Sequence, residues 1–129
     1  MGDAKIDLAF QKVKKALTSL DEMAKAPQQA NRGNIDAAIQ RFEFTIELFW
    51  KLLKKILESK GVLTEYPKDV LREAYRGHLI DDENVWLSML KDRNLTSHTY
   101  DEKIANEIYD HIQGYLPVFA STLEHLRKQ

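Results

Sequence analysis

The segment from Asn34 to Lys60 reads NIDAAIQRFEFTIELFWKLLKKILESK, and its apolar pattern decides the fold. Apolar residues recur in it at steps of three and four, which is the spacing of one helix face. They are Ile35, Ile39, Phe42, Ile46, Phe49, Leu53 and Leu57. The segment ends at Gly61, a residue that commonly stops a helix. The pattern therefore predicts one long helix.

Other faces of the same segment are also apolar, at Phe44, Leu48, Trp50 and Leu52. We therefore expect this helix to be central in the bundle or to lie partly in a subunit interface. A polar line remains through Gln40, Glu43, Glu47, Lys51 and Lys54. Two of its members, Glu43 and Glu47, have the i and i+4 spacing of a metal-binding or acid/base carboxylate pair. A solvated face or a polar contact across a dimer is the interpretation that we favour.

Four further helices are predicted around this segment. A long one covers Ala4–Lys25 and precedes the polar turn APQQANRGN, and a short one begins at Pro67 and ends at Gly77. A second short helix, DENVWLSMLKDRNL, has Asp81 as its expected cap. The last helix starts from the capping box Thr99-x-x-Glu102, and Pro117 is expected to bend it. The prediction is an all-α, up-and-down bundle with three long helices and two short ones.

Composition narrows the class of protein further. The 129 residues suit a single domain spanning 1–129, and the absence of cysteine excludes disulfides and thiolate metal sites. The N-terminal residues contain no apolar signal region, and no apolar run is long enough to cross a bilayer, so we expect a cytoplasmic protein. With 19 basic and 20 acidic residues the formal net charge is −1, so any contact with a polyanion must be local.

The stretch KDRNLTSHTYDEK, residues 91–103, carries the candidate chemistry. In an unbroken helix Arg93 and His98 would point about 140° apart. If one helix ends near Leu95 and the next begins with Thr99, the two side chains flank a corner and can converge. The alternative interpretation is a chance spacing, with His98 an ordinary turn residue.

Such a corner has the groups needed to cleave RNA without a metal. Arg93 can grip a phosphate with two parallel N–H groups, Asn94 adds an uncharged donor and acceptor, and a helix N-terminus favours anions. Histidine exchanges a proton readily at physiological pH, so His98 can act as general base or general acid. Each chain supplies only one such group here, and a symmetric dimer would supply two.

The segments Ile39–Lys54, Pro67–Asp82 and Trp86–Ile108 resemble the nucleotidyltransferase substrate-binding protein family of the HEPN superfamily, over nearly the whole chain. The most specific match is DRNLTSHTYDE, where Arg93, Asn94 and His98 fit the superfamily motif. Tyr100 completes the longer motif of its toxin branch, called HepT.

This resemblance implies a helical homodimer, or a higher oligomer, whose paired motifs form a metal-independent ribonuclease site. It also implies a minimal nucleotidyltransferase partner that acts as antitoxin and transfers AMP to the motif tyrosine, here Tyr100. The family's older name implies a different role, a non-catalytic subunit that presents substrate or nucleotide to the transferase. We expect no cofactor and no metal, and we interpret His78, His111 and His125 as surface or packing residues.

Overall fold

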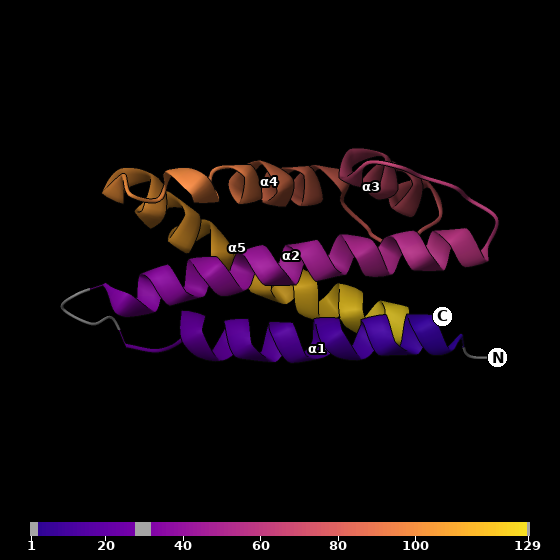
Figure 1. Cartoon of the computed structure of the whole chain (residues 1–129), viewed down its shortest axis with the longest axis horizontal. Coiled ribbons are helices and arrows are strands. Elements are labelled where there is room, and N and C mark those ends of the chain that lie inside the picture. Colours follow the sequence, from indigo (N-terminus) through magenta and orange to yellow (C-terminus); the bar gives the residue numbers. More distant parts are fainter. Residues whose placement is uncertain (1–2, 28–31, 129) are drawn as a thin grey trace.

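The computed structural model describes residues 3–27 and 32–128 (Figure 1). All regular structure in this part of the chain is helical. The long helices are α1 (Ala4–Ala24), α2 (Gly33–Ser59) and α5 (Glu102–Arg127). The short ones are α3 (Pro67–Arg76) and α4 (Glu83–Asn94), and a 3-10 turn, η1, covers Thr96–His98. The predicted all-α bundle of three long and two short helices is confirmed.

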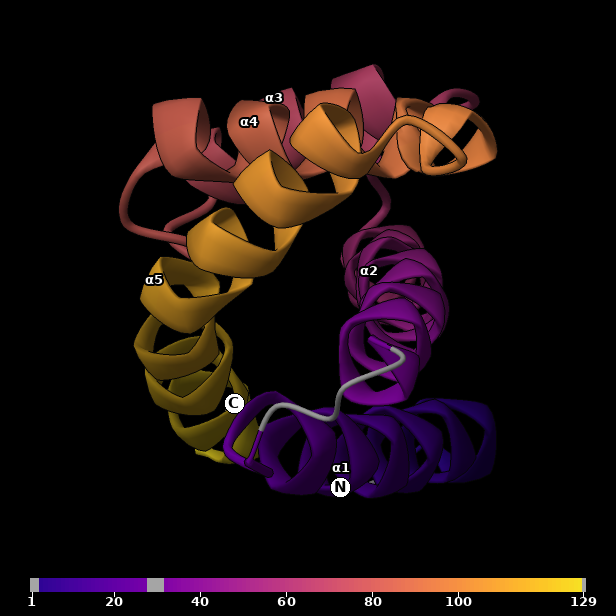
Figure 2. The same cartoon turned by 90° about the vertical axis from the view of Figure 1, so that its left-hand side faces the viewer.

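The five helices enclose one core. In both views α1 and α2 lie side by side, while α3 and α4 cover the opposite side of α2 and α5 closes the bundle (Figures 1 and 2). The ring of Phe49 stacks on Phe119 of α5 at 5.2 Å between centroids and meets Trp86 of α4 at 5.0 Å. Because all three side chains are fully buried, these contacts join α2, α4 and α5 through one aromatic cluster.

The central position predicted for α2 is confirmed. It packs against each of the other four α-helices. The seven residues of the predicted stripe are all buried, and Leu52 is buried as well. Phe44 on another face is 54% exposed, whereas Leu48 and Trp50 are partly buried. In a single chain, Phe44 and Leu48 therefore form an apolar strip on the outer face of α2.

The helix ends mostly follow the predicted signals. Gly61 adopts the left-handed φ of 84° that ends α2, and Pro67 occupies the first turn of α3. The cap of α4 is Asp82, and the prediction of Asp81 is wrong by one residue. Asp82 is the residue with an extended backbone directly before the helix. Its carboxylate therefore accepts hydrogen bonds from the backbone N–H groups of Asn84, at 3.0 Å, and Val85.

The other predicted features of the chain have mixed outcomes. The helix α5 continues through Pro117, and the bend expected there stays a prediction. Residues 28–31 of the predicted turn APQQANRGN lie outside the described residues. In the part of the chain that the structure describes, none of the helices is long and apolar enough to cross a membrane.

Candidate functional site at the corner between α4 and α5

The predicted helix break between Arg93 and His98 is present. Helix α4 ends at Asn94, and the N–H of Leu95 donates to the carbonyls of Asp92, at 3.0 Å, and Lys91. The chain then tightens into η1, in which the N–H of His98 donates to Leu95 O at 2.9 Å. Arg93 and His98 therefore lie on different elements on either side of a corner.

The start of α5 differs from the predicted capping box. The N-cap is Asp101, whose carboxylate accepts the N–H of Lys103 at 2.9 Å. Thr99 instead follows the 3-10 turn η1, and its hydroxyl donates to the carbonyl of Thr96 in that turn at 3.0 Å. The hydroxyl is therefore not used to cap α5. A cap at Thr99 would place Tyr100 in the first turn of α5, whereas in the structure Tyr100 precedes the cap.

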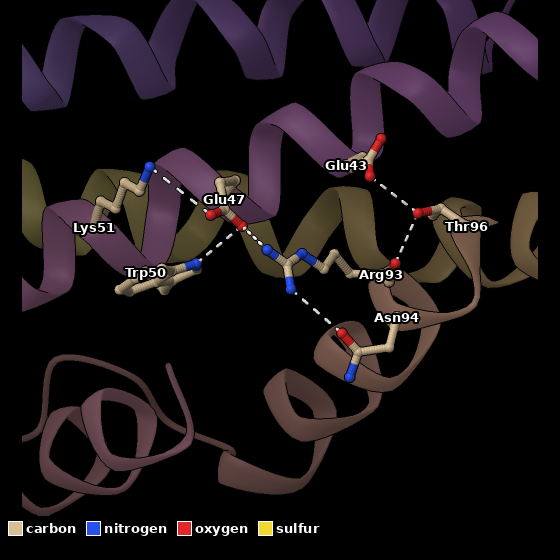
Figure 3. Close-up of polar contacts among 7 residues, drawn as sticks. All are labelled: Glu43, Glu47, Trp50, Lys51, Arg93, Asn94 and Thr96. Carbon is tan, nitrogen blue, oxygen red and sulfur yellow. Dashed lines mark hydrogen bonds and ion pairs between the residues drawn. The ribbon is translucent and has the colours of Figure 1, made fainter. Parts of the chain in front are cut away.

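The guanidinium of Arg93 is held by α2 (Figure 3). Its Nη2 lies 2.5 Å from Oε2 of Glu47, and its Nη1 donates to Oδ1 of Asn94 at 3.3 Å. The same carboxylate accepts the indole N–H of Trp50 at 3.2 Å and faces Lys51 Nζ at 3.8 Å. Both side chains of the central pair are about two-thirds buried, so the arginine has a defined orientation.

Glu43 gives α2 a second contact with the corner, one turn before Glu47. Its Oε2 lies 3.1 Å from the hydroxyl oxygen of Thr96, which also lies 2.7 Å from Arg93 O. Glu43 and Glu47 are partly buried against the corner and not fully solvated, and the contact across a dimer stays a prediction. The sequence shows that both carboxylates share one helix face, but only the packing of α4 on α2 brings them to Arg93 and Thr96.

His98 and Tyr100 occupy the outer side of the corner. Both are exposed, Tyr100 to 84%, and their ring centroids are 6.2 Å apart at an interplanar angle of 63°. Within residues 3–27 and 32–128 no hydrogen bond or ion pair joins either residue to Arg93. The structure thus brings the four predicted residues to one corner as two pairs, Arg93 with Asn94 and His98 with Tyr100.

Beneath this corner lies a polar cluster that the sequence interpretation missed. Asp92 is only 5% exposed, and its Oδ2 accepts the hydroxyl of Tyr115 at 2.6 Å and faces Nδ1 of His111 at 2.9 Å. Burial first, and then the hydrogen bond and the charge of Asp92, raise the pKa of Tyr115 well above its ordinary value. The signal in the sequence was a carboxylate three residues after Met89, on the inward face of α4.

The corner carries groups of the kind that bind anions. Among the described residues no group of three or more histidine, cysteine, aspartate or glutamate side chains is arranged to hold a metal ion. What the corner offers is a held guanidinium, an amide, an exposed imidazole and an exposed phenol. These groups can bind an anion and exchange a proton.

The structure thus defines a small all-helical domain with a broken-helix corner between α4 and α5. The comparison with known families is more specific. Residues 8–128 match the family described as nucleotidyltransferase substrate binding protein like, and the chain belongs to that family.

Two similar proteins are described by different roles, one as a ribonuclease and the other as a substrate-binding domain. A Haemophilus influenzae protein named "Probable ribonuclease HepT" is 41% identical over 100 residues, which cover 74% of this chain and 68% of that protein. HI0074 from Haemophilus influenzae, described as having the fold of a substrate binding domain of a nucleotidyltransferase, is 33% identical with a TM-score of 0.71. That match covers 96% of this chain and 98% of the other.

A crystal structure of a Thermus thermophilus protein is also similar. It is 39% identical to this chain with a TM-score of 0.82, and the match covers 89% of this chain and 98% of that one. The fold is therefore shared along almost the full length of both solved structures.

Proposed function

We propose that this protein is a metal-independent endoribonuclease of the HEPN type, the toxin-like half of a pair with a minimal nucleotidyltransferase. The observation that carries the proposal is the helix break, which puts a held arginine and an exposed histidine on the two sides of one corner. Similarity to a protein named "Probable ribonuclease HepT" supports the same class of reaction.

The chemistry is an internal transesterification of RNA. The imidazole of His98 removes the proton of a ribose 2′-hydroxyl, whose oxygen attacks the adjacent phosphorus. The bond from phosphorus to the 5′ oxygen breaks, and that oxygen takes a proton from a second, protonated imidazole acting as general acid. The products carry a 2′,3′-cyclic phosphate and a 5′-hydroxyl. Arg93 stabilises the charge that builds on the phosphoryl oxygens, and Asn94 orients the guanidinium.

A second copy of the chain completes this site. One chain offers a single imidazole, and the reaction uses both a base and an acid. The outward strip of α2 supplies a surface for a second copy, because Phe44 is 54% exposed beside the partly buried Leu48. Phe44 directly follows Glu43 and Leu48 directly follows Glu47 on α2, so the strip adjoins the polar face that contacts the corner.

The nucleotidyltransferase partner acts on the outer side of the corner. The hydroxyl of Tyr100 suits transfer of AMP because its side chain is 84% exposed beside the ring of His98. A bulky adenylate there would cover the imidazole and place negative charge where the RNA phosphate binds. Modification of Tyr100 would therefore switch the nuclease off.

The deciding experiment is cleavage of RNA by the purified chain in EDTA. We expect fragments with 2′,3′-cyclic phosphate ends, and we expect His98→Ala to lose about 100-fold or more of the rate because a general base is removed. His98 is exposed, so the variant should unfold at the wild-type temperature. His125→Ala, an exposed histidine near the other end of α5, is the matched control. Equal cleavage by His98→Ala and wild type would contradict the proposal.

A second candidate function is a non-catalytic subunit that presents substrate or nucleotide to the transferase. The pairing of Arg93 with Glu47 favours it, since a guanidinium already bound to a carboxylate is less available to a phosphate. The description of HI0074 supports the same role. This alternative predicts that the chain leaves RNA intact but forms a stable complex that changes the kinetics of the transferase.

A further inference from the structure

A buried carboxylate joins α4 to α5 at the residue that precedes Arg93. Asp92 is 5% exposed, and its Oδ2 is shared by two donors of α5, the hydroxyl of Tyr115 at 2.6 Å and Nδ1 of His111 at 2.9 Å. Tyr115 is itself only 6% exposed and stacks on Phe42 of α2 with 5.6 Å between ring centroids. Burying a carboxylate is unfavourable unless donors surround it, so one arrangement of the two helices is strongly preferred.

The donors of this cluster persist over the physiological range of pH. Burial and the Asp92 contact raise the pKa of Tyr115, so its hydroxyl stays protonated and continues to donate. The imidazole of His111 can keep its proton on Nδ1 in the neutral form, and the cation also carries a proton there. The link between α4 and α5 therefore does not require one charge state of the histidine.

The contact of Asp92 with α5 lies close in the chain to the residues of the candidate site. Asp92 immediately precedes Arg93 in the last turn of α4, whereas His111 and Tyr115 lie in the middle of α5. The segment between these anchors contains η1 and the exposed pair His98 and Tyr100. A change in the angle between α4 and α5 would move Arg93 relative to His98.

We propose that Asp92 is a positioning residue, which through Tyr115 and His111 fixes the corner so that Arg93 and His98 address the same phosphodiester. This proposal rests on the ribonuclease function proposed above. The side chain of Asp92 is buried, so it would act through its α5 partners and not by contacting the RNA. A displacement of about 1 Å between reacting groups can cost on the order of 100-fold in rate, so loss of the link should reduce turnover more than binding.

The test compares two tyrosines of α5. Tyr115→Phe removes the hydroxyl that binds Asp92, and Tyr109→Phe removes a hydroxyl that donates to Ala24 O at 3.1 Å and joins α5 to α1 instead. Tyr109 is 8% exposed, so both changes remove one hydrogen bond from a buried side chain. We expect Tyr115→Phe to lower kcat by about 10-fold or more with KM within about twofold, and Tyr109→Phe to leave both near wild type.

A second measurement, amide hydrogen exchange, does not depend on RNA cleavage. Amide hydrogen exchange should become faster at Leu95, His98 and Asp101 in Tyr115→Phe, and at Lys25 and Ala26 in Tyr109→Phe. His111→Ala, a change at a half-exposed side chain, should repeat the first pattern if Tyr115→Phe does not fold.

These measurements distinguish failure of the ribonuclease proposal from failure of the positioning role of Asp92. If wild-type protein does not cut RNA, the ribonuclease assignment fails and hydrogen exchange alone decides whether Asp92 positions the corner. Equal exchange at the corner in the two tyrosine variants would overturn the positioning role. An unchanged kcat for Tyr115→Phe in an active enzyme would overturn it as well.

Discussion

Glu47 and Arg93 are separated by 46 residues in the chain, and their carboxylate and guanidinium meet at 2.5 Å. This contact attaches the last turn of α4 to the middle of α2 and gives the arginine a fixed direction. In the proposed ribonuclease site, the same contact places a negative charge where the RNA phosphate would bind. Under that proposal, Glu47 both orients Arg93 and competes with the RNA.

Glu47→Gln should bind RNA more tightly than wild type. Glutamine keeps an acceptor for Arg93 and Trp50 but removes the competing charge. A partly exposed ion pair contributes up to about 1 kcal/mol, so the Kd for a short RNA should fall by up to about fivefold. Fluorescence anisotropy with cleavage-inactive His98→Ala protein as the background measures this change. Glu73→Gln is the control, because Glu73 forms a similar pair with Arg76 on α3 at 2.9 Å. Weaker RNA binding by Glu47→Gln would show that the carboxylate only orients the arginine.

Phe44→Glu should convert a dimer into monomers. A charge on the exposed strip of α2 would be buried without a partner in the proposed interface, which is strongly unfavourable. We expect the molar mass from light scattering to halve and RNA cleavage to fall with it. Leu63→Glu is the control, since Leu63 is 82% exposed but lies in the loop after α2. A dimer that survives Phe44→Glu would exclude this face of α2 as the interface.

Incubation with the cognate nucleotidyltransferase and ATP should add one adenylate to Tyr100 and abolish cleavage. Mass spectrometry of Tyr100→Phe should show no adenylate, because the transfer needs the phenol oxygen. Tyr66→Phe should be modified like wild type and is a suitable control, since Tyr66 is also well exposed, at 63%. Equal modification of Tyr100→Phe would assign the transfer to another residue.

Stability should fall in alkali because of Tyr115. Its pKa is raised in the folded protein above the value of about 10 in an unfolded chain, so the unfolded state releases a proton at lower pH. The stabilisation is complete below pH about 10 and is lost progressively above it. The free energy of unfolding by urea, measured from pH 8 to 11, should therefore fall less steeply in Tyr115→Phe than in wild type. Parallel curves for the two proteins would contradict the burial of a protonated Tyr115.

Much of the fold was predictable from the sequence because the signals are local. The stripe from Ile35 to Leu57 buries as its spacing predicts, and Gly61 and Pro67 mark the end of one helix and the start of another. The break after Asn94 was predictable for the same reason. The motif itself identified Arg93, Asn94, His98 and Tyr100 as the candidate site.

Where local signals compete, the prediction failed by a few residues. Thr99 and Asp101 are both good helix caps, and so are Asp81 and Asp82. The backbone geometry of the preceding turn selects between them, and η1 gives the cap of α5 to Asp101. That choice moves Tyr100 out of the helix and leaves it exposed.

The sequence by itself determined the helices, the broken corner and the identity of the residues on it, because helix spacing and capping act over a few neighbouring residues. Only the tertiary structure decided what holds those residues. Glu47 reaches Arg93 and Asp92 reaches Tyr115 because helices far apart in the chain pack together. No periodicity within a single helix encodes which carboxylate will face which donor, since that depends on how the buried faces of the helices fit.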